Sequence, residues 1–340
     1  MVGRLTIFTV KPSGLQAQWH ASCLFGKFGI TSIETTCMVL SNVNGKLLSP
    51  NRSPATVPPV EEVQFTVLAS GSSGNAAYLE TPNSRVLIDC GISAKRIREA
   101  LLNLNRTPER LDGILITHEH SDHVSGLKTL AAKLGIPVYC NRHTAEEIRR
   151  IHDSEFDFRL VETGNPFEIG DLNVDTFPIP HDAIDPMGFV LHTPEGRIGF
   201  LTDMGHGTRL VADRVRDAEV LLLETNHDVD LLNNDPRRPW SLKQRILSRH
   251  GHLSNEGAAQ FLEQLIHPEL QHIYCAHLSS ECNTPDLAHT EIHTQLGQLG
   301  ASFVDVTVTS PRQPCQTLGL SGKKVRFNAE KTVATPSNAL

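Results

Sequence analysis

The fold of this chain is decided by residues 117–123, which read Thr117-His118-Glu119-His120-Ser121-Asp122-His123. Four potential metal ligands lie within this stretch, directly after the apolar run Gly113-Ile114-Leu115-Ile116, which predicts a buried strand. Because side chains alternate along an extended chain, His118 and His120 are expected to point the same way. Asp122 and His123 follow at the point where a helical pattern begins. Imidazole and carboxylate ligands together suit zinc, and they also suit manganese or iron.

Outside residues 117–123, four more polar side chains lie at the ends of apolar runs, namely Asp89, His181, Asp203 and His277. Any one of them alone is most simply a surface or hydrogen-bonded residue. Strand ends at one edge of a sheet sandwich converge, however, so together with the histidine stretch they predict a metal centre. Asp89 is expected to hold one of the imidazoles in place rather than to bind metal, with a simple turn or cap as the alternative.

The order of the predicted elements defines the fold class. Strands come first and strand–helix alternation follows, and this sequence of elements occurs twice along the chain. The pattern predicts an α+β fold, a four-layer αββα sandwich in which two mixed β-sheets pack face to face with helices outside. The domain is expected to span residues 63–310. Residues 1–62 and the basic tail 311–340 are predicted to be disordered extensions, because they are rich in turn-forming residues and lack a sustained period.

The composition narrows the class of protein. The chain has 340 residues, of which 39% are hydrophobic, and its net charge is −7. The first 60 and the last 30 residues each carry a net charge of about +4, which leaves about −15 for the middle. An acidic core is a poor general surface for a polyanion. No apolar run approaches a membrane span, and the seven scattered cysteines favour reduced thiols, so we expect a cytoplasmic protein that does not contact membranes.

The ligand stretch and four further segments resemble the five motifs of the metallo-β-lactamase superfamily, in the same order. These segments are Leu87-Ile88-Asp89, Pro180-His181, Thr202-Asp203 and Ala276-His277-Leu278-Ser279. Other segments resemble its YycJ/WalJ-like (VicX) subgroup, namely residues 67–75, 224–228, 242–246 and 251–255. The resemblance covers residues 63–308 and leaves both terminal extensions outside.

The resemblance implies a site for two divalent metal ions, zinc first and manganese or iron as alternatives. His118, His120 and His181 would bind one ion. Asp122, His123 and His277 would bind the second, Asp203 would bridge the two, and Asp89 would support a ligand. Such a pair of ions lowers the pKa of water and neutralises charge on the attacked centre.

The implied activity is hydrolysis of phosphodiester bonds by attack of a metal-activated hydroxide on phosphorus. We expect a DNA exonuclease, with DNA favoured over RNA as the nucleic-acid substrate. A small-molecule hydrolase for a phosphodiester or a thioester is one alternative, and a non-catalytic accessory factor in a signalling complex is another. The oligomeric state stays open.

Catalytic roles beyond the metal ligands are assigned to three residues. Asp122 is expected to act in catalysis as well as in metal binding, and His252 and His227 are candidates to protonate the leaving group. Local turn stabilisation is the alternative for both histidines. The loop 70–75 is glycine- and serine-rich, so Ser72, Ser73 and Asn75 are candidates to bind a substrate phosphate. A simple hairpin turn explains that loop equally well.

Overall fold

The computed structural model describes residues 5–10, 16–21 and 62–327, and the chain divides into two units, residues 1–55 and 56–340. In the first unit, strands β1 (Leu5–Val10) and β2 (Gln16–Ala21) pair antiparallel. The structure therefore differs at these strands from the expectation that residues 1–62 form a disordered extension. The rest of that expectation lies outside the described residues.

The second unit is built on two mixed sheets. One has the order β17-β16-β3-β4-β5-β6-β7-β8 and the other has the order β15-β14-β13-β12-β11-β10-β9. The first sheet contains β3 (Val63–Ala69), β4 (Ala76–Glu80), β5 (Arg85–Ile88), β6 (Gly113–Leu115), β7 (Val138–Cys140) and β8 (Phe158–Leu160). The second contains β9 (Phe167–Ile169), β10 (Leu172–Pro178), β11 (Met187–Thr193), β12 (Gly196–Leu201), β13 (Val220–Glu224), β14 (His272–Ala276) and β15 (Asp305–Val308).

Each sheet repeats the same pairing pattern. Antiparallel pairing from β3 to β5 gives way to parallel pairing from β5 to β8, and the second sheet changes in the same way at β12. The inner parallel strands β6, β13 and β14 are buried along their whole length, so their sequences are mostly apolar. In β13, Val220 and Leu222 pack between the sheets, whereas Leu221 and Leu223 face the helices. Side-chain alternation thus lets one strand serve two cores.

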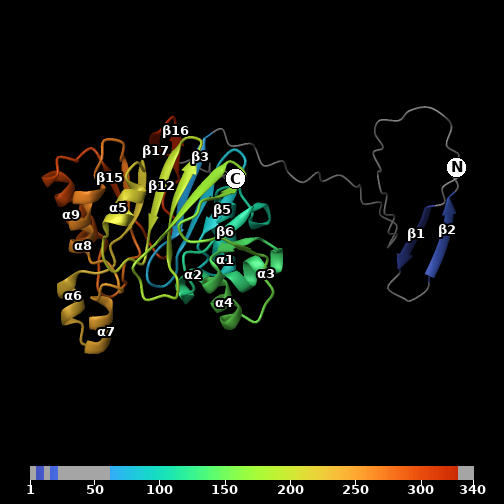
Figure 1. Ribbon diagram of the computed structural model, residues 1–340, viewed down its shortest axis with the longest axis horizontal. Coiled ribbons are helices and arrows are strands. Elements are labelled where there is room, and N and C mark those ends of the chain that lie inside the picture. The colour runs from blue at the N-terminus through green and yellow to red at the C-terminus, as the bar shows by residue number, and fades with distance from the viewer. Residues whose placement is uncertain (1–4, 11–15, 22–61, 328–340) are drawn as a thin grey trace, which may run out of the picture. The chain divides into compact units, whose positions relative to one another are not determined.

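Helices cover the outer face of each sheet. The helices α1 (Ala94–Asn103), α3 (Leu127–Leu134) and α4 (Arg142–Ile151) pack on the first sheet, and α5 (Arg209–Val215), α8 (Asn255–Leu265) and α9 (Pro285–Gln298) pack on the second. Figure 1 shows the two sheets between these groups of helices. The side chain of Ser93 caps α1 by accepting a hydrogen bond from Arg96 N. The predicted four-layer αββα sandwich is confirmed.

The C-terminal boundary of the domain differs from the prediction. Strands β16 (Leu318–Ser321) and β17 (Lys324–Phe327) form a hairpin, and β16 pairs antiparallel with β3. Leu318 and Leu320 alternate along β16 and are fully buried in the core between the sheets. The prediction that order ends at residue 310 is therefore wrong for residues 311–327, because two alternating leucines suffice to add a strand to an open edge.

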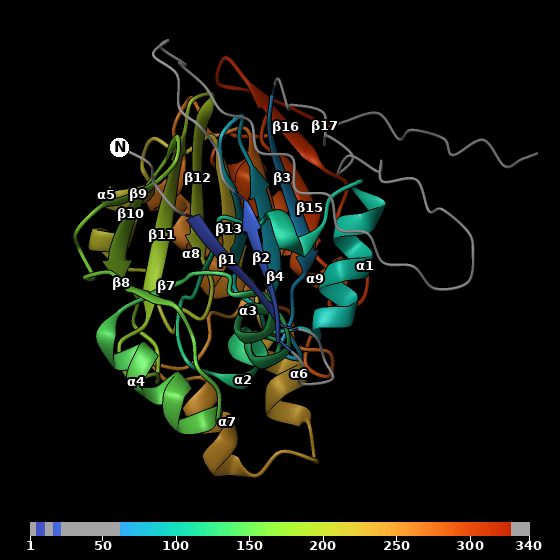
Figure 2. The same ribbon diagram turned by 90° about the vertical axis from the view of Figure 1, so that its right-hand side faces the viewer.

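Three short helices lie at one edge of the sandwich. They are α2 (Ser121–Val124), α6 (Val229–Asn234) and α7 (Trp240–Ile246). Figures 1 and 2 show α6 and α7 extending beyond the ends of the strands on the edge that also carries α2. A 3-10 turn, η1 (Pro108–Arg110), precedes β6. Among the described residues no helix has the length and apolar character needed to cross a membrane.

Candidate metal centre

The ligand stretch turns sharply where β6 ends. His120 is extended, with φ −60° and ψ 149°, and α2 begins at the next residue. The turn is held from outside, because Asn75 N donates to Asp122 O at 2.8 Å and Cys90 N donates to His123 O at 2.8 Å. The chain passes so close here that a Cβ on Gly91 would lie 1.5 Å from Asp122 O. Only glycine fits at residue 91, so the loop after β5 positions the ligand turn.

Three predicted site residues adopt a left-handed backbone conformation directly after their strands. The φ angles are 60° at Asp89, 55° at Asp203 and 59° at His277. This conformation costs a non-glycine residue roughly 1–2 kcal/mol. Such strain occurs at functional sites where the surrounding structure holds it. Here it turns the carboxylates and the imidazole at the strand ends towards one another.

The first group of candidate ligands consists of His118, His120 and His181. The ring centroids of His118 and His120 lie 4.6 Å apart, and the His181 ring lies 5.1 Å from each of them. The Nε2 of His118 is buried and has no hydrogen-bond partner. One ligand atom from each residue lies within 4.8 Å of the others, so the three can hold one ion.

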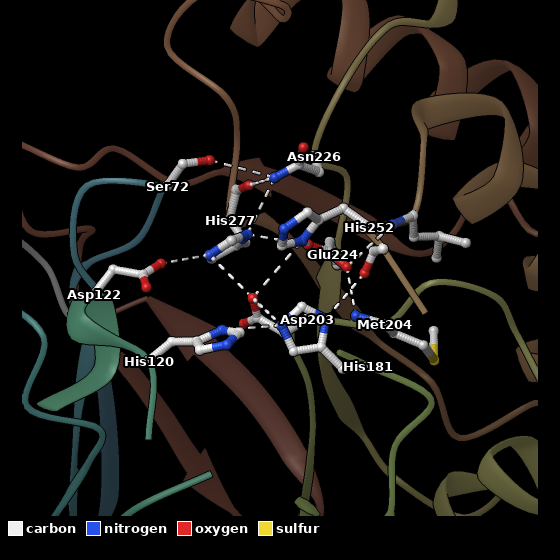
Figure 3. A network of polar contacts seen from close by, with 12 residues as sticks. Ser72, His120, Asp122, His181, Asp203, Met204, Glu224, Asn226, His252 and His277 are labelled. Carbon is white, nitrogen blue, oxygen red and sulfur yellow. Dashed lines mark hydrogen bonds and ion pairs between the residues drawn. The ribbon is translucent and has the colours of Figure 1, made fainter. Parts of the chain in front are cut away.

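The second group consists of Asp122, His123, Asp203 and His277, again within 4.8 Å of one another. His123 Nε2 lies 3.0 Å from Asp203 Oδ2, and His277 Nε2 lies 3.1 Å from Asp122 Oδ2. Asp203 also reaches the first group, since its Oδ1 lies 3.7 Å from His181 Nε2. Asp203 is thus placed between the two groups, as Figure 3 shows.

The Nδ1 atoms of three of these imidazoles are hydrogen-bonded to other groups of the protein. His123 Nδ1 lies 2.7 Å from Asp89 Oδ2, His181 Nδ1 lies 3.0 Å from Gly251 O, and His277 Nδ1 lies 3.0 Å from Glu224 Oε1. If each Nδ1 carries the proton, each Nε2 presents a lone pair to the centre. The buried Oδ2 of Asp203 has no hydrogen-bond partner either. This donor set fits divalent metal ions.

Two pKa shifts within the centre also favour the binding of divalent metal ions. Burial and the neighbouring His123 lower the pKa of His118 well below its usual value, which favours the neutral form that binds metal. Burial opposes ionisation of Asp203, but His277 and His123 overcome it and hold the pKa of that carboxyl well below its usual range. Burial opposes the protonated forms of His123 and His277, but Asp203 outweighs it and raises the pKa of both imidazoles well above its usual value. Since imidazole binds metal in its neutral form, an ion bound by these two histidines would displace their protons.

Glu224 is a site residue that the sequence analysis did not single out. It ends β13, is fully buried, and its Oε1 accepts from His252 Nδ1 at 2.8 Å as well as from His277. Its Oε2 accepts from Met204 N at 2.6 Å and from Leu253 N at 3.1 Å. Burial opposes its ionisation, yet the charge of His252 and the hydrogen bonds lower the pKa of Glu224 to about 2. The available signal was its position, since it follows a buried apolar strand just as Asp203 and His277 do.

The structure places the other predicted residues as follows. His252 lies beside the centre, with its Nδ1 3.7 Å from Asp203 Oδ1. His227 is buried, its Nε2 has no hydrogen-bond partner, and burial lowers its pKa to about 4. Ser72 and Ser73 are exposed, whereas Asn75 is buried and its Nδ2 lies 3.2 Å from His123 Nε2. Ser72, His227 and His252 thus line one cleft, whereas Asn75 helps to hold the turn of residues 117–123 through its hydrogen bonds to Asp122 O.

The fold and the donor set define a class of protein, and comparison with known proteins agrees. The family model described as Beta-lactamase superfamily domain matches residues 84–273. Among solved structures, the metallo-β-lactamase fold protein YhfI from Bacillus subtilis has a TM-score of 0.58 at 15% identity, over 74% of this chain and 98% of that chain. A diphosphatase from the PhnP family has a TM-score of 0.53 at 17% identity, over 75% and 97%. The chain belongs to the metallo-β-lactamase superfamily.

Two curated relatives place the chain more closely. It is 39% identical over 258 residues to exodeoxyribonuclease WalJ of Streptococcus pneumoniae serotype 2, covering 73% of this chain and 94% of that protein. It is 36% identical over 264 residues to exodeoxyribonuclease YycJ of Bacillus anthracis, covering 74% and 97%. Within the superfamily, the chain belongs to the WalJ/YycJ family, and the predicted resemblance is confirmed.

Proposed function

We propose that this protein is a metal-dependent phosphodiester hydrolase that degrades DNA from an end. The observation that carries the proposal is the placement of Asp203 between two groups of buried imidazoles, which fits a pair of ions. The relatives that cover most of the chain bear the name exodeoxyribonuclease. The donor set favours a hydrolase over a non-catalytic accessory factor, and the relatives favour DNA over a thioester or another small substrate.

The centre would hold two divalent ions, zinc first and manganese or iron as alternatives. His118, His120 and His181 would bind one, Asp122, His123 and His277 the other, and Asp203 both. Bound ions supply an activated water and neutralise the charge of the phosphate. Asp89 keeps His123 in the tautomer that binds metal, through the 2.7 Å contact to its Nδ1.

We assign the proton for the leaving oxygen to His252. Its Nδ1 is committed to Glu224, so Nε2 is the nitrogen that can face substrate. Glu224 is a positioning residue, because it holds the imidazole and stabilises the imidazolium without touching the reacting atoms. His227 is a poorer donor, since its low pKa keeps the ring neutral. Ser72 remains a candidate substrate contact, because its Oγ lies 3.4 Å from Asn226 Nδ2 at the mouth of the centre.

A cytoplasmic location belongs to the same proposal. The described residues contain five free cysteines, Cys90, Cys140, Cys275, Cys282 and Cys315, of which four are buried. Free thiols are typical of a reducing compartment. DNA is the nucleic acid we favour as substrate.

An assay panel tests the proposed function. The purified protein is incubated, with and without manganese, with linear DNA, circular DNA, RNA, bis-p-nitrophenyl phosphate and a thioester. We expect cleavage of linear DNA that requires metal and spares the closed circle. Asp122→Ala should abolish it, whereas Asp217→Ala, an exposed carboxylate outside the centre, should not. Hydrolysis of the thioester alone, or equal activity of Asp122→Ala, would refute the proposal.

A further inference from the structure

The segment 229–249, here called the basic arm, differs in charge from the acidic body around it. It contains five cations, Arg237, Arg238, Lys243, Arg245 and Arg249, against Asp230 and Asp235. Its net charge of about +3 contrasts with about −15 for residues 61–310 as a whole. The arm comprises α6 and α7 and projects from the edge of the sandwich that carries the metal centre (Figures 1 and 2).

Lys243 and Arg238 are held by the protein, since Arg238 is only 20% exposed and pairs with Asp235 and Glu281. The other three cations of the arm are available to a ligand. Lys243 is buried and donates to Asn233 O at 2.7 Å, which joins α7 to α6. The side chains of Arg237 and Arg245 are 64% and 60% exposed, and Arg249 is also exposed. Asp182 pairs with Arg245 through its Nε, and a guanidinium has four further N–H donors. Asp235 orients Arg237 and Asp182 orients Arg245, while Arg249 contacts His206 Nε2 at 2.8 Å. All three arginines keep N–H donors with which they can bind phosphate oxygens.

A cleft connects the basic arm to the metal centre. It has a volume of about 190 Å³, and Arg238 and Arg245 line it together with His252, His227, Asn226 and Ser72. The cleft thus has cations of the arm on one side and the proposed proton donor on the other. A strand whose scissile phosphate lies at the centre would pass its neighbouring phosphates along these arginines.

Trp240 is the second feature of the arm. It is 63% exposed, more than any other large hydrophobic residue in the described part of the chain, and it is the first residue of α7. Trp240 belongs to none of the three hydrophobic clusters of the described residues, so its exposed face is available to a ligand. Aromatic side chains beside cations are the usual means of binding single-stranded nucleic acid, because any base can stack on them.

We propose that the basic arm binds a single DNA strand next to the metal centre, with Arg237, Arg245 and Arg249 on its phosphates and Trp240 stacked on a base. This inference rests on the proposed nuclease function and specifies that the DNA strand is unpaired where it meets the arm. Stacking requires a free base face, which a duplex interior does not offer. The arm also explains how a protein with a negative net charge can bind DNA, because its arginines create a positive field beside the metal centre.

Tryptophan fluorescence tests the stacking directly. The chain has two tryptophans, Trp19 and Trp240, so Trp19→Phe leaves Trp240 as the only one. Titration of this variant with a short oligothymidylate, in a chelator that prevents cleavage, should quench the emission. Trp240→Ala should raise the Kd roughly tenfold, as expected for loss of one stacked base, and Trp240→Phe should restore most of the affinity. Phe303→Ala, at an aromatic residue that is 58% exposed elsewhere, is the matched control and should not change the Kd.

The salt dependence of binding tests the arginines. Replacement of Arg237 or Arg249 by glutamate should weaken binding and lower the slope of log Kd against log salt concentration by about 0.7 per lost phosphate contact. Arg159→Glu is the matched control, because Arg159 is 58% exposed on β8 of the other sheet. Melting temperatures and metal content identify any variant that fails to fold.

The outcomes separate the inference from the proposed function. Wild-type binding without quenching of Trp240, or variants of the arm that bind as tightly as wild type, would overturn the role of the arm. Absence of oligothymidylate binding by the wild type would overturn it as well. Cleavage of linear DNA by the wild type is measured separately, and its absence would overturn the proposed function instead.

Discussion

His252→Ala provides the sharpest test of the proposed chemistry, because His252 is assigned a proton transfer and no role as a metal ligand. The leaving oxygen of a DNA phosphodiester is an alkoxide, which needs a proton. The leaving group of bis-p-nitrophenyl phosphate is a weakly basic phenolate, which does not. The variant should therefore lose activity on DNA and keep most of its activity on the small ester.

The size of the loss follows from the site. A positioned general acid contributes about 10²- to 10⁴-fold, which corresponds to about 3–5 kcal/mol of activation free energy. His252 is anchored by one hydrogen bond of 2.8 Å to the buried Glu224. A hydrogen bond to a charged group contributes about 1.5–3 kcal/mol, so Glu224→Gln should slow DNA cleavage by about 10- to 100-fold. Glu224→Gln should also lower metal content, because Glu224 accepts from His277 as well.

The assay compares kcat for both substrates in wild type, His252→Ala, Glu224→Gln and His250→Ala. His250 is an exposed histidine of the same loop and serves as the matched control. Both residues serve one proton transfer, so their effects should not add. Apart from any further loss of metal, the double variant of His252 and Glu224 should cleave DNA as fast as His252→Ala alone. An equal loss on both substrates in His252→Ala, at unchanged metal content, would refute the assignment.

Three further predictions concern the centre and the fold. Asp203→Asn should lower metal affinity by more than the roughly 100-fold that loss of a residue behind a ligand costs. The number of ions bound per chain is compared with wild type, and unchanged metal content would contradict the bridging role. His272 is fully buried with both ring nitrogens unpartnered, and burial lowers its pKa to about 4. Between pH ~6.5 and 4 the unfolded chain therefore binds a proton that the folded protein does not bind at His272. The free energy of unfolding should fall by about 3 kcal/mol as the pH drops through this range. His272→Leu should flatten that fall in urea unfolding, and an equally steep fall would contradict the reasoning. Leu320→Ala should lower the free energy of unfolding by about 2–5 kcal/mol, since the side chain is fully buried in the core between the sheets. A loss below about 1 kcal/mol would place β16, which pairs with β17 and β3, outside the core.

The sequence was a good guide to the elements and a poorer one to their ends. Long apolar runs such as Val220–Glu224 predict buried strands reliably, because no other short element buries every side chain. The stretch Ser302-Phe303-Val304 by itself predicts a strand from Ser302, but the last strand of the second sheet begins three residues later, at Asp305. The register there is set by pairing of Asp305 with His272, which is a contact between distant residues.

The hairpin β16–β17 shows the same limitation on a larger scale. Its sequence, with glycines and lysines, has weak strand character of its own. It becomes ordered because β3 offers an unpaired edge and because Leu318 and Leu320 fill the core between the sheets. Tertiary context, rather than local preference, decides such a segment.

The sequence by itself indicated the candidate ligands of residues 118–123, because six consecutive residues leave little freedom in how imidazoles and a carboxylate are presented after a strand. It also determined the fold class, through the periodicity of the strands and helices. Only the tertiary structure decided that Asp203 lies between two groups of ligands, that Glu224 joins His252 to His277, and that the basic arm lines the cleft beside them. Each of these depends on strand ends far apart in the chain meeting at one edge, where left-handed turns at Asp89, Asp203 and His277 aim the side chains inwards.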